Sequence, residues 1–477
     1  MAEGKKFAPA GTHSDILANP VLMDFGTLIG KWDLDAWVEW LGNFGISRAL
    51  LLSILFFGLL GTLSKLVPNV SLFIFEWLVG TAPIWLPIAL GVSAWKAWKF
   101  YTLANHLFKT KTIVLEMKVP REITRSPRAM ELALTTLWTS SGETTFILRH
   151  WRGQVRPYYS FEIVSIGGQV HFYVWCRESD KNAIESALYA YYPEIELHEV
   201  EDYASKFQFD STKYSAFCTD HILYPRNDAY PIKSYVDFEL DQDPKEEFRV
   251  DPLASVLEYM SGLKPQEQAW VQIIITLNKD KRSSSHGLFA SESRWEGMIK
   301  EEVQKIRKAA SLNPGMEDTP EGTDRKYGFP RPTWSEQEQM KAMERHLGKL
   351  PFSVGIRAVY IAEKKYFNGT SYNGVRWMWR PLNNPGYLNT LRPKYWTNTL
   401  DYPWQHFGGY RLQLLTRRFF DAYRRRSYFY PPWTTPYFMM STEAIATLWH
   451  PPSRAISAPG LERIPAKKAE PPANLPR

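Results

Sequence analysis

The stretch ISRALLLSILFFGLLGTLSKL, Ile46–Leu66, is apolar over almost its whole length, and a second apolar run, Val70–Trp95, follows it after a short break. A helix of about 20 apolar residues, rising about 1.5 Å per residue, crosses a hydrocarbon core of about 30 Å. We therefore expect a two-helix transmembrane hairpin over residues 46–95, kinked in its second helix by Pro83 and Pro87. Two alternatives are a buried helical hairpin of a soluble protein and a re-entrant hairpin that does not fully cross.

The charges that flank the two apolar runs predict their orientation. Lys31 and Arg48 precede or open the first run, Lys96 and Lys99 follow the second, and Lys65 alone lies at the connection. Because cytoplasmic flanks carry the excess of Lys and Arg, both termini and the large C-terminal region are predicted to be cytoplasmic.

Composition and motifs argue against an enzyme. The chain has 477 residues, a net charge of +7 and a pI of about 9.0, which is less basic than a dedicated nucleic-acid binder. Its two cysteines, Cys176 and Cys218, exclude a disulfide framework and a cysteine-based zinc module. The sequence contains no GxxxxGK[ST], HExxH or GxSxG pattern. We therefore predict no catalytic residue, no cofactor and no metal site.

The region after the apolar runs predicts an α+β fold. Residues 112–205 alternate in the order strand, helix, strand, strand, helix, strand, with Gly167-Gly168 marking a tight turn, and this order is that of a ferredoxin-like (split βαβ) module. Residues 212–450 predict a second such module that carries a helical insertion at about 280–350. In this second module we expect Arg411–Arg426 as the last helix and Pro436–Ser441 as the last strand.

The two ends of the chain differ from these modules. Residues 1–45 form a predicted cytoplasmic segment in which Trp32–Leu41 has the spacing of a short amphipathic helix. Residues 451–477 are punctuated by proline and predict an extended tail without a core of its own.

Four arginines form the clearest charged group. Arg417, Arg418, Arg424 and Arg425 fall on one side of the predicted helix, opposite its apolar side chains. They are candidates for contact with the phosphate of lipid or nucleic acid, and the alternative is a solvated helix face.

The segment Tyr366–Tyr410 is rich in aromatic residues interleaved with Arg and Lys. Its candidate residues for stacking on single-stranded nucleic acid, or for contact with a partner, are Trp377, Trp379, Tyr395 and Trp396. The alternative is an irregular loop that packs on the protein itself.

Several stretches resemble an uncharacterised bacterial family that forms the membrane-anchored N-terminal region of type IV secretion or conjugation-like ATPases, of the HerA or coupling-protein kind. The stretches that carry the resemblance are SPRAMELALTTL (Ser126–Leu137), SFEIVSIGGQV (Ser160–Val170), DAYPIKSYVDFEL (Asp228–Leu240), DPLASVLEYMSGLKPQEQAWVQIII (Asp251–Ile275) and MSTEAIATLWHPPSRAISAPGLERIPAKKAEPPANLP (Met440–Pro476). In those proteins the proline-rich segment leads on to the motor, whereas here the chain ends at Arg477. The resemblance therefore implies that the P-loop ATPase is a separate chain, was lost, or belongs to a longer form of this chain, and it supplies no nucleotide site here.

The sequence is compatible with three functions. The first is a non-catalytic membrane scaffold of the bacterial cytoplasmic membrane, a homo-oligomer that positions an ATPase of a DNA or protein transfer machine. The second is a membrane-tethered protein that binds single-stranded nucleic acid through Arg417–Arg425 and the aromatic segment. The third is an enzyme with an unfamiliar site.

Overall fold

The computed structural model describes residues 53, 56–59, 61, 62, 65, 70–120, 123, 125–138, 145–241, 250–278, 281–283, 291–311, 332–396, 409–454, 456 and 458–464. The expected amphipathic helix at Trp32–Leu41 and most of the expected first span lie outside these residues. The chain divides into two compact units, residues 1–96 with 399–412, and residues 97–398 with 413–477.

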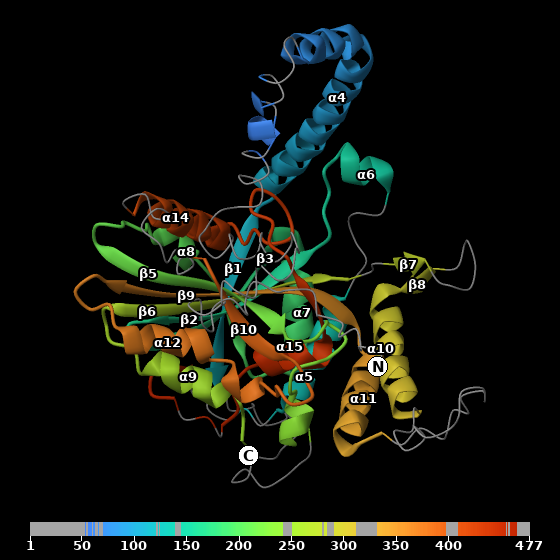
Figure 1. Cartoon of the computed structure of the whole chain (residues 1–477). Helices are drawn as coiled ribbons and strands as arrows, with labels where there is room; N and C mark the ends of the chain where they lie inside the picture. Colours follow the sequence, from blue (N-terminus) through green and yellow to red (C-terminus); the bar gives the residue numbers. More distant parts are fainter. Residues whose placement is uncertain are drawn as a thin grey trace, which may run out of the picture. The chain divides into compact units, whose positions relative to one another are not determined.

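The second apolar run is helical, as predicted. It forms most of α4, Val70–Lys109, which contains Pro83 and Pro87 and bends in its N-terminal half (Figure 1). Within the described residues, one helix is long and apolar enough to cross a membrane, over Phe75–Lys109, and none of its most apolar window is buried.

A large mixed α+β fold follows α4, and its centre is a ten-stranded sheet (Figure 1). The strand order is β10-β5-β9-β6-β2-β3-β1-β12, with β4 added beside β1 and β11 beside β9. Every pair in this sheet is antiparallel except β1 with β12. Its strands are β1 (Thr112–Pro120), β2 (Tyr158–Ile166), β3 (Gln169–Arg177), β4 (Glu196–Val200), β5 (Tyr214–Tyr224), β6 (Glu267–Leu277), β9 (Pro351–Glu363), β10 (Thr390–Tyr395), β11 (Phe438–Ser441) and β12 (Arg463–Ile464).

Helices cover both faces of this sheet. On one face lie α5 (Pro127–Leu137), α7 (Lys181–Tyr191), α9 (Leu253–Ser261), α12 (Gly369–Trp377) and α15 (Thr442–Leu448). On the other lie α8 (Tyr203–Lys206), α14 (Tyr410–Arg424) and the C-terminal end of α4. The remaining elements are α6 (Phe146–His150), the hairpin β7 (Lys281–Ser283) and β8 (Ser291–Ser293), the helix pair α10 (Arg294–Ser311) and α11 (Trp334–Leu347), and the short 3-10 helices η2 (Glu178–Asp180), η3 (Tyr235–Phe238) and η5 (Arg380–Leu382).

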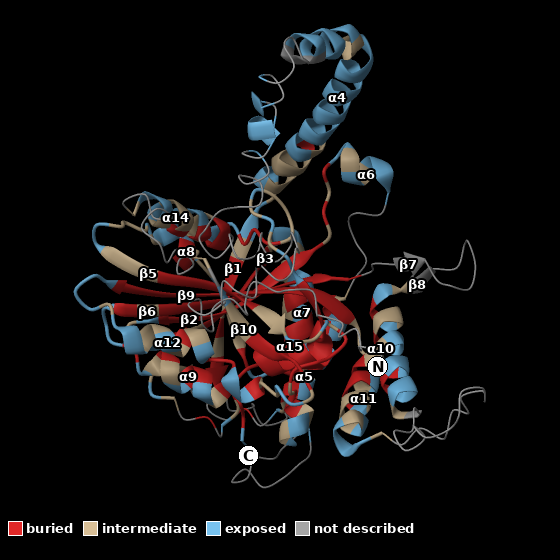
Figure 2. Cartoon of the chain, viewed as in Figure 1, coloured by how far each residue is buried: buried red, intermediate tan, exposed pale blue. Residues whose placement is uncertain are grey.

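Covering both faces explains why the central strands are buried along nearly their whole length (Figure 2). The two sides of the sheet form separate cores. The larger core includes Leu134, Leu257 and Ile445, and the smaller includes Trp270 and Phe419.

Local sequence signals placed several elements correctly. Gly167 and Gly168 have φ angles of +60° and +88° in the β2–β3 turn, a conformation that favours glycine. Pro127 opens α5 after the N-cap residue Ser126. Thr333 and Glu336 form a capping box at the start of α11.

The two halves of the sheet have the same strand order. The first half runs β4-β1-β3-β2 and the second runs β10-β5-β9-β6. They join through the antiparallel pairing of β2 with β6, from Tyr158 opposite Thr276 to Ile166 opposite Gln268. The two predicted modules therefore share one continuous sheet.

The expected helix Arg411–Arg426 and strand Pro436–Ser441 are present as α14 and β11, but they do not take the places of last helix and last strand in the second half. The helix α14 covers the opposite face from α9, and β11 pairs with β9 at the end of that strand. Their expected places are taken by α12 and by β10, which contains Pro393. Proline is tolerated in β10 because this edge strand bonds only to β5.

The start of the expected free tail also differs. Ile456 and Leu461 are buried in the larger core, and β12 pairs with β1. The backbone packs so closely there that a Cβ on Gly460 would lie 1.8 Å from the carbonyl oxygen of Gly168. Residues 465–477 lie outside the described residues.

Candidate functional site

The C-terminal end of α4, from Ala97 to Lys109, packs onto the sheet domain. Thr102 is buried, and Leu103 and Leu107 pack against the smaller core. Trp98 Nε1 donates a hydrogen bond of 3.2 Å to the carbonyl oxygen of His150. Gly153, at φ +64°, lets the chain approach α4 so closely that a Cβ would lie 2.2 Å from the carbonyl oxygen of Thr102. These turns of α4 are thus fixed to the domain.

A cleft of about 750 Å³ lies beside this end of α4. Tyr101, Asn105 and Phe108 of α4 line one part of it, and Arg424 and Arg425 line another. Tyr101 and Phe108 are strongly exposed. The cleft combines exposed aromatic rings with cationic groups, a combination that suits an amphiphilic anion.

The four predicted arginines all lie exposed on or just after α14. Arg425 Nε lies 2.8 Å and Arg424 Nη2 lies 3.4 Å from Oδ1 of Asp421. Burial would raise the pKa of Asp421, but the Trp433 hydrogen bond and Arg425 outweigh it and lower that pKa. Two of the four cations are therefore partly neutralised by one carboxylate.

The other two arginines lie apart from the cleft. The guanidinium of Arg418 lies 5.5 Å from the ring centre of Trp433. Arg417 lines a smaller hollow of about 340 Å³ with Phe209 and Phe420. Arg424 lines both hollows, with Arg425 at the larger one and Arg417 at the smaller one.

Arg426, the next residue along, lies in an extended polar cluster that its local sequence did not predict. It is fully buried at φ +49°, and its Nε and Nη2 donate to the carboxylate oxygens of Glu162 at 3.0 and 3.1 Å. Nη2 also donates to Asp202 at 2.8 Å. Tyr203 and Gln272 donate further bonds to Glu162 at 2.8 and 3.0 Å. A glutamate as the one charged residue of the strand YYSFEIVSI was the sequence signal for a buried partner.

The electrostatics of this cluster keep both sides charged. Burial alone would lower the pKa of Arg426, but Glu162 and Asp202 raise it well above its usual value. Burial would raise the pKa of Asp202, but Arg426 outweighs it and holds that pKa low. Asp202 is thus an ion-pair partner of Arg426.

Of the predicted aromatic residues, Trp377, Trp379 and Trp396 do not form one stacking surface. Trp377 is 40% exposed, with Arg376 over its ring, whereas Trp379 is 2% exposed and lies in the larger core. Trp396 donates from Nε1 to Asp220 at 2.6 Å and packs against Phe419. Tyr395 ends β10, opposite Thr219. Since Trp379 offers no free ring face, this arrangement does not favour nucleic-acid stacking.

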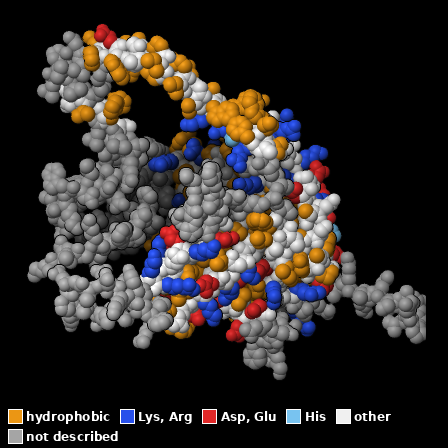
Figure 3. Space-filling view, turned by 90° about the vertical axis from the view of Figure 1, so that its right-hand side faces the viewer, with side chains coloured by type: hydrophobic (Ala, Val, Ile, Leu, Met, Phe, Trp, Pro, Cys, Tyr) orange, Lys and Arg blue, Asp and Glu red, His pale blue; other side chains and the backbone are white. Residues whose placement is uncertain are grey.

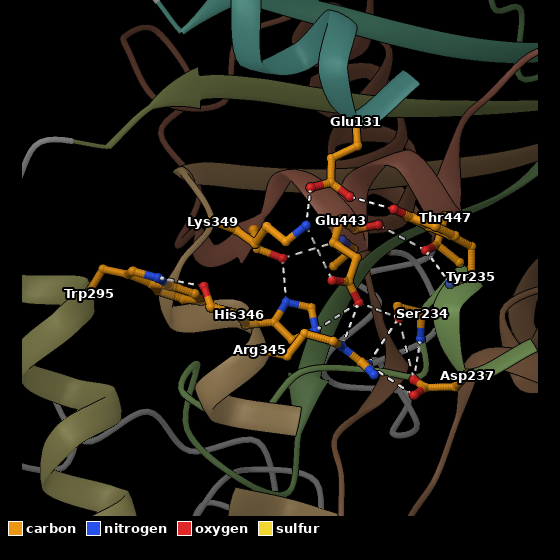
Figure 4. A network of polar contacts seen from close by, with 12 residues as sticks. Glu131, Ser234, Tyr235, Asp237, Trp295, Arg345, His346, Lys349, Glu443 and Thr447 are labelled. Carbon is orange, nitrogen blue, oxygen red and sulfur yellow. Dashed lines mark hydrogen bonds and ion pairs between the residues drawn. The ribbon is translucent and has the colours of Figure 1, made fainter. Parts of the chain in front are cut away.

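A second polar cluster joins α5, η3, α11 and α15 (Figure 4). Glu443 is buried at its centre, where it accepts from Ser234 Oγ at 2.5 Å and lies 3.0 Å from Arg345 Nε. Glu131 accepts from Tyr235 at 2.6 Å and pairs with Lys349. These contacts fasten α11 to the core.

In this cluster a serine contacts a histidine, and the histidine in turn lies next to a carboxylate. His346 Nδ1 is hydrogen-bonded to Ser441 Oγ, and His346 Nε2 lies 3.5 Å from Glu443 Oε1. All three side chains are almost completely buried, and Ser441 Oγ also accepts from the backbone N–H of Ala444 at 3.3 Å as the N-cap of α15. The geometry therefore supports a structural role, with the serine capping a helix.

His346 predicts an acid-sensitive fold. Burial and then Arg345 lower the pKa of His346 from 6.5 to about 3. Between these values the unfolded chain binds a proton that the folded chain does not, so stability should fall as pH decreases, by about 1.4 kcal/mol per pH unit. Chemical unfolding of the full chain at pH 7, 6, 5 and 4 measures this slope.

The matched variants are His346→Gln and His198→Gln, since His198 is exposed on β4. In the H346Q chain the dependence of unfolding free energy on pH should be smaller by about 1.4 kcal/mol per pH unit, the contribution of one proton. The H198Q chain should keep most of the wild-type dependence. Equal slopes in the wild type and H346Q would contradict the prediction.

Within the described part of the chain, no three His, Cys, Asp or Glu side chains are grouped so that they could hold a metal ion. Cys176 and Cys218 are buried thiols, and burial raises the pKa of both.

Comparison with known proteins places most of the chain in one family. Residues 120–462 match a family described as a domain of unknown function, DUF8128. No curated protein matches the chain. The matched range begins at the end of β1 and runs through the sheet to β12.

Proposed function

We propose a function from the structure itself, because this chain belongs to the DUF8128 family, a domain of unknown function. The protein is a non-catalytic docking platform, anchored in the bacterial cytoplasmic membrane, that recruits or positions a P-loop ATPase of a type IV secretion or conjugation-like transfer machine. The observation that carries the membrane part is α4, which is exposed and apolar over one stretch and packed on the domain over its last turns.

The exposed apolar side chains of α4 support a membrane span. Phe73, Trp77, Ile84 and Ile88 are each more than three-fifths exposed. Exposing the apolar side chains of a helix to water costs free energy. The same helix is stable in lipid, because its backbone hydrogen bonds are satisfied internally. We place the domain in the cytoplasm because Lys96, Lys99, Lys109 and Lys111 follow the span.

The internal order of the sheet supports a rigid platform. We infer that β4-β1-β3-β2 and β10-β5-β9-β6 are two ferredoxin-like modules joined edge to edge. The Arg426 and Glu443 clusters each tie together segments far apart in sequence, which suits a base that holds other molecules. The ATPase partner and the assembly into a homo-oligomer rest on the resemblance of Ser126–Leu137 and Met440–Pro476 to the membrane-anchored regions of such ATPases.

Membrane attachment is the first test. The full chain, expressed in bacteria, should stay in the membrane pellet after an alkaline carbonate wash. A variant with two lysines near the middle of each apolar run, L55K/L59K/I84K/I88K, should move largely to the supernatant, because a lysine at the bilayer centre costs about 2.5–3.5 kcal/mol. Quantitative blotting of both fractions measures the shift.

The control variant is F108K/L132K, since Phe108 and Leu132 are exposed outside the apolar runs. It should stay in the pellet with the wild type. Recovery of the wild-type chain from the aqueous fraction, free of lipid and detergent, would contradict the anchor.

The docking role has a separate test. Crosslinking in intact membranes, followed by purification of this chain and mass spectrometry, should recover a P-loop ATPase. The same experiment on the carbonate-soluble variant should recover much less of it. If no ATPase co-purifies with this chain under several crosslinking chemistries, the docking role is overturned and the membrane anchor is unaffected.

A further inference from the structure

We propose that α6 and the end of α4 form a second membrane contact, which dips into the interface of a bilayer containing anionic phospholipid. The surface consists of Trp98, Tyr101, Phe146, Ile147 and Trp151, and we call it the α4–α6 patch. The proposal rests on the proposed membrane anchor and adds to it a lipid-binding surface on the domain itself.

The first observation is that α6 is a regular helix although none of its side chains is buried. Phe146, Ile147 and the following Trp151 are 61%, 61% and 56% exposed. The helix is held at one end by Thr145, whose Oγ1 accepts from Leu148 N at 3.3 Å. A short ordered element that presents large apolar groups to water indicates a surface that is covered by something else.

The second observation is that α4 holds α6 in place. The rings of Trp98 and Trp151 meet edge to face with centres 5.4 Å apart, and Trp98 Nε1 donates to the carbonyl oxygen of His150 at 3.2 Å. Trp98 and Tyr101, which are 38% and 62% exposed, complete the patch. The apolar groups of α6 are thus attached to the helix that carries the membrane-length apolar stretch.

The occupant follows from position and charge. Trp98 and Tyr101 come directly after the apolar stretch of α4, and at about 1.5 Å of rise per residue they fall at the depth where Trp and Tyr belts lie in membrane proteins. Arg149 and Arg152 are exposed beside the apolar residues of α6. Figure 3 is turned so that the side labelled α6 in Figure 1 faces the viewer, and it shows hydrophobic side chains gathered there with Lys and Arg around them. Aromatic groups bordered by cations suit a lipid interface with anionic head groups.

The basic face of α14 agrees with this assignment. Leu103 and Leu107 of α4 pack against the same smaller core as Phe419 and Tyr423 of α14. The exposed Arg424 and Arg425 therefore lie on the face of the sheet that carries the end of α4, where lipid phosphate would be within reach of a membrane-bound domain.

The test uses the full chain in nanodiscs, with an environment-sensitive NBD label on a cysteine at position 147. The natural Cys176 and Cys218 are buried, so an Ile147→Cys variant gives one accessible thiol. In discs of phosphatidylcholine with one-quarter phosphatidylglycerol, lipids with a nitroxide near the top of the acyl chain should quench the label by at least half. A label at Leu132→Cys, on the opposite face of the sheet, should be quenched at least threefold less.

The charge part has its own variant. Arg149→Gln with Arg152→Gln, in the I147C chain, should reduce quenching about twofold in anionic discs and leave it unchanged in discs of phosphatidylcholine alone. Equal quenching with and without phosphatidylglycerol would overturn the anionic preference.

Failure of the patch and failure of the anchor give different results. If the chain enters nanodiscs but both labels remain equally exposed to aqueous iodide, the patch is overturned and the anchor stands. If the chain does not enter nanodiscs at all, the anchor itself fails. Shielding of the label at position 147 that grows with protein concentration in detergent, without quenching by lipid, would assign the patch to a second copy of the chain and overturn the lipid contact.

Discussion

Replacing Arg426 with methionine should lower the free energy of unfolding by about 3–5 kcal/mol, which is the usual cost of leaving a buried charge without its partner. Arg426 is fully buried and forms paired contacts with Glu162 at 3.0 and 3.1 Å. Methionine fills much of the same volume, so the loss would come mainly from the uncompensated carboxylate. Guanidinium unfolding of the full chain in detergent, followed by tryptophan fluorescence, measures the change.

The neighbouring residue supplies the control. Arg425 is exposed and pairs with Asp421 along the helix at 2.8 Å, so Arg425→Met should change stability by less than about 1 kcal/mol. The contrast between two adjacent arginines separates burial from charge. Equal unfolding midpoints for R426M and R425M would contradict the assignment of Arg426 as the charged centre of the smaller core.

A further variant tests whether the pairing itself matters. Glu162→Gln keeps the shape of the side chain and leaves Arg426 with Asp202 as its remaining carboxylate partner. We expect this variant to be destabilised, and the double variant R426M/E162Q to be less destabilised than the sum of the single changes, because the two residues interact directly. Additive effects would show that the two residues act independently.

Replacing Trp449 with alanine should also cost about 3–5 kcal/mol, as expected for a large aromatic side chain removed from a core. Trp449 is completely buried, with ring centres 4.8 Å from Phe161 and 5.8 Å from Phe172. Its Nε1 donates to the backbone carbonyl of Glu162 at 3.3 Å. Differential scanning fluorimetry of the full chain should show a clear fall in the unfolding temperature.

Trp377→Ala is the matched control, because Trp377 is 40% exposed on α12. It should change stability by less than about 1 kcal/mol. A larger effect at Trp377 than at Trp449 would contradict the described core. Trp449 and Arg426 both contact Glu162, one through its backbone and the other through its side chain, so β2 couples the two layers of the domain.

Features that depend on neighbouring residues could be predicted from the amino-acid sequence alone. The apolar composition of Val70–Trp95 predicted the helix that forms most of α4, and the glycine pair at 167 and 168 predicted the β2–β3 turn. The order strand, helix, strand, strand, helix, strand in residues 112–205 was likewise predicted, whereas the short helix α6 was not. Turn conformation, helix capping and amphipathic periodicity are set within a few residues, so a single sequence is enough to reveal them.

Which elements pack against one another became known from the folded structure. The amphipathic pattern of α14 predicted a helix but not the sheet face that it covers, and the pattern of Phe438–Ser441 predicted a strand but not its pairing with β9. The local sequence of Arg426 does not distinguish it from the neighbouring surface arginines. The fold places it beside its partner Glu162, which lies 264 positions away. Pairing and burial across such separations depend on the packing of the whole domain, and no local pattern records them.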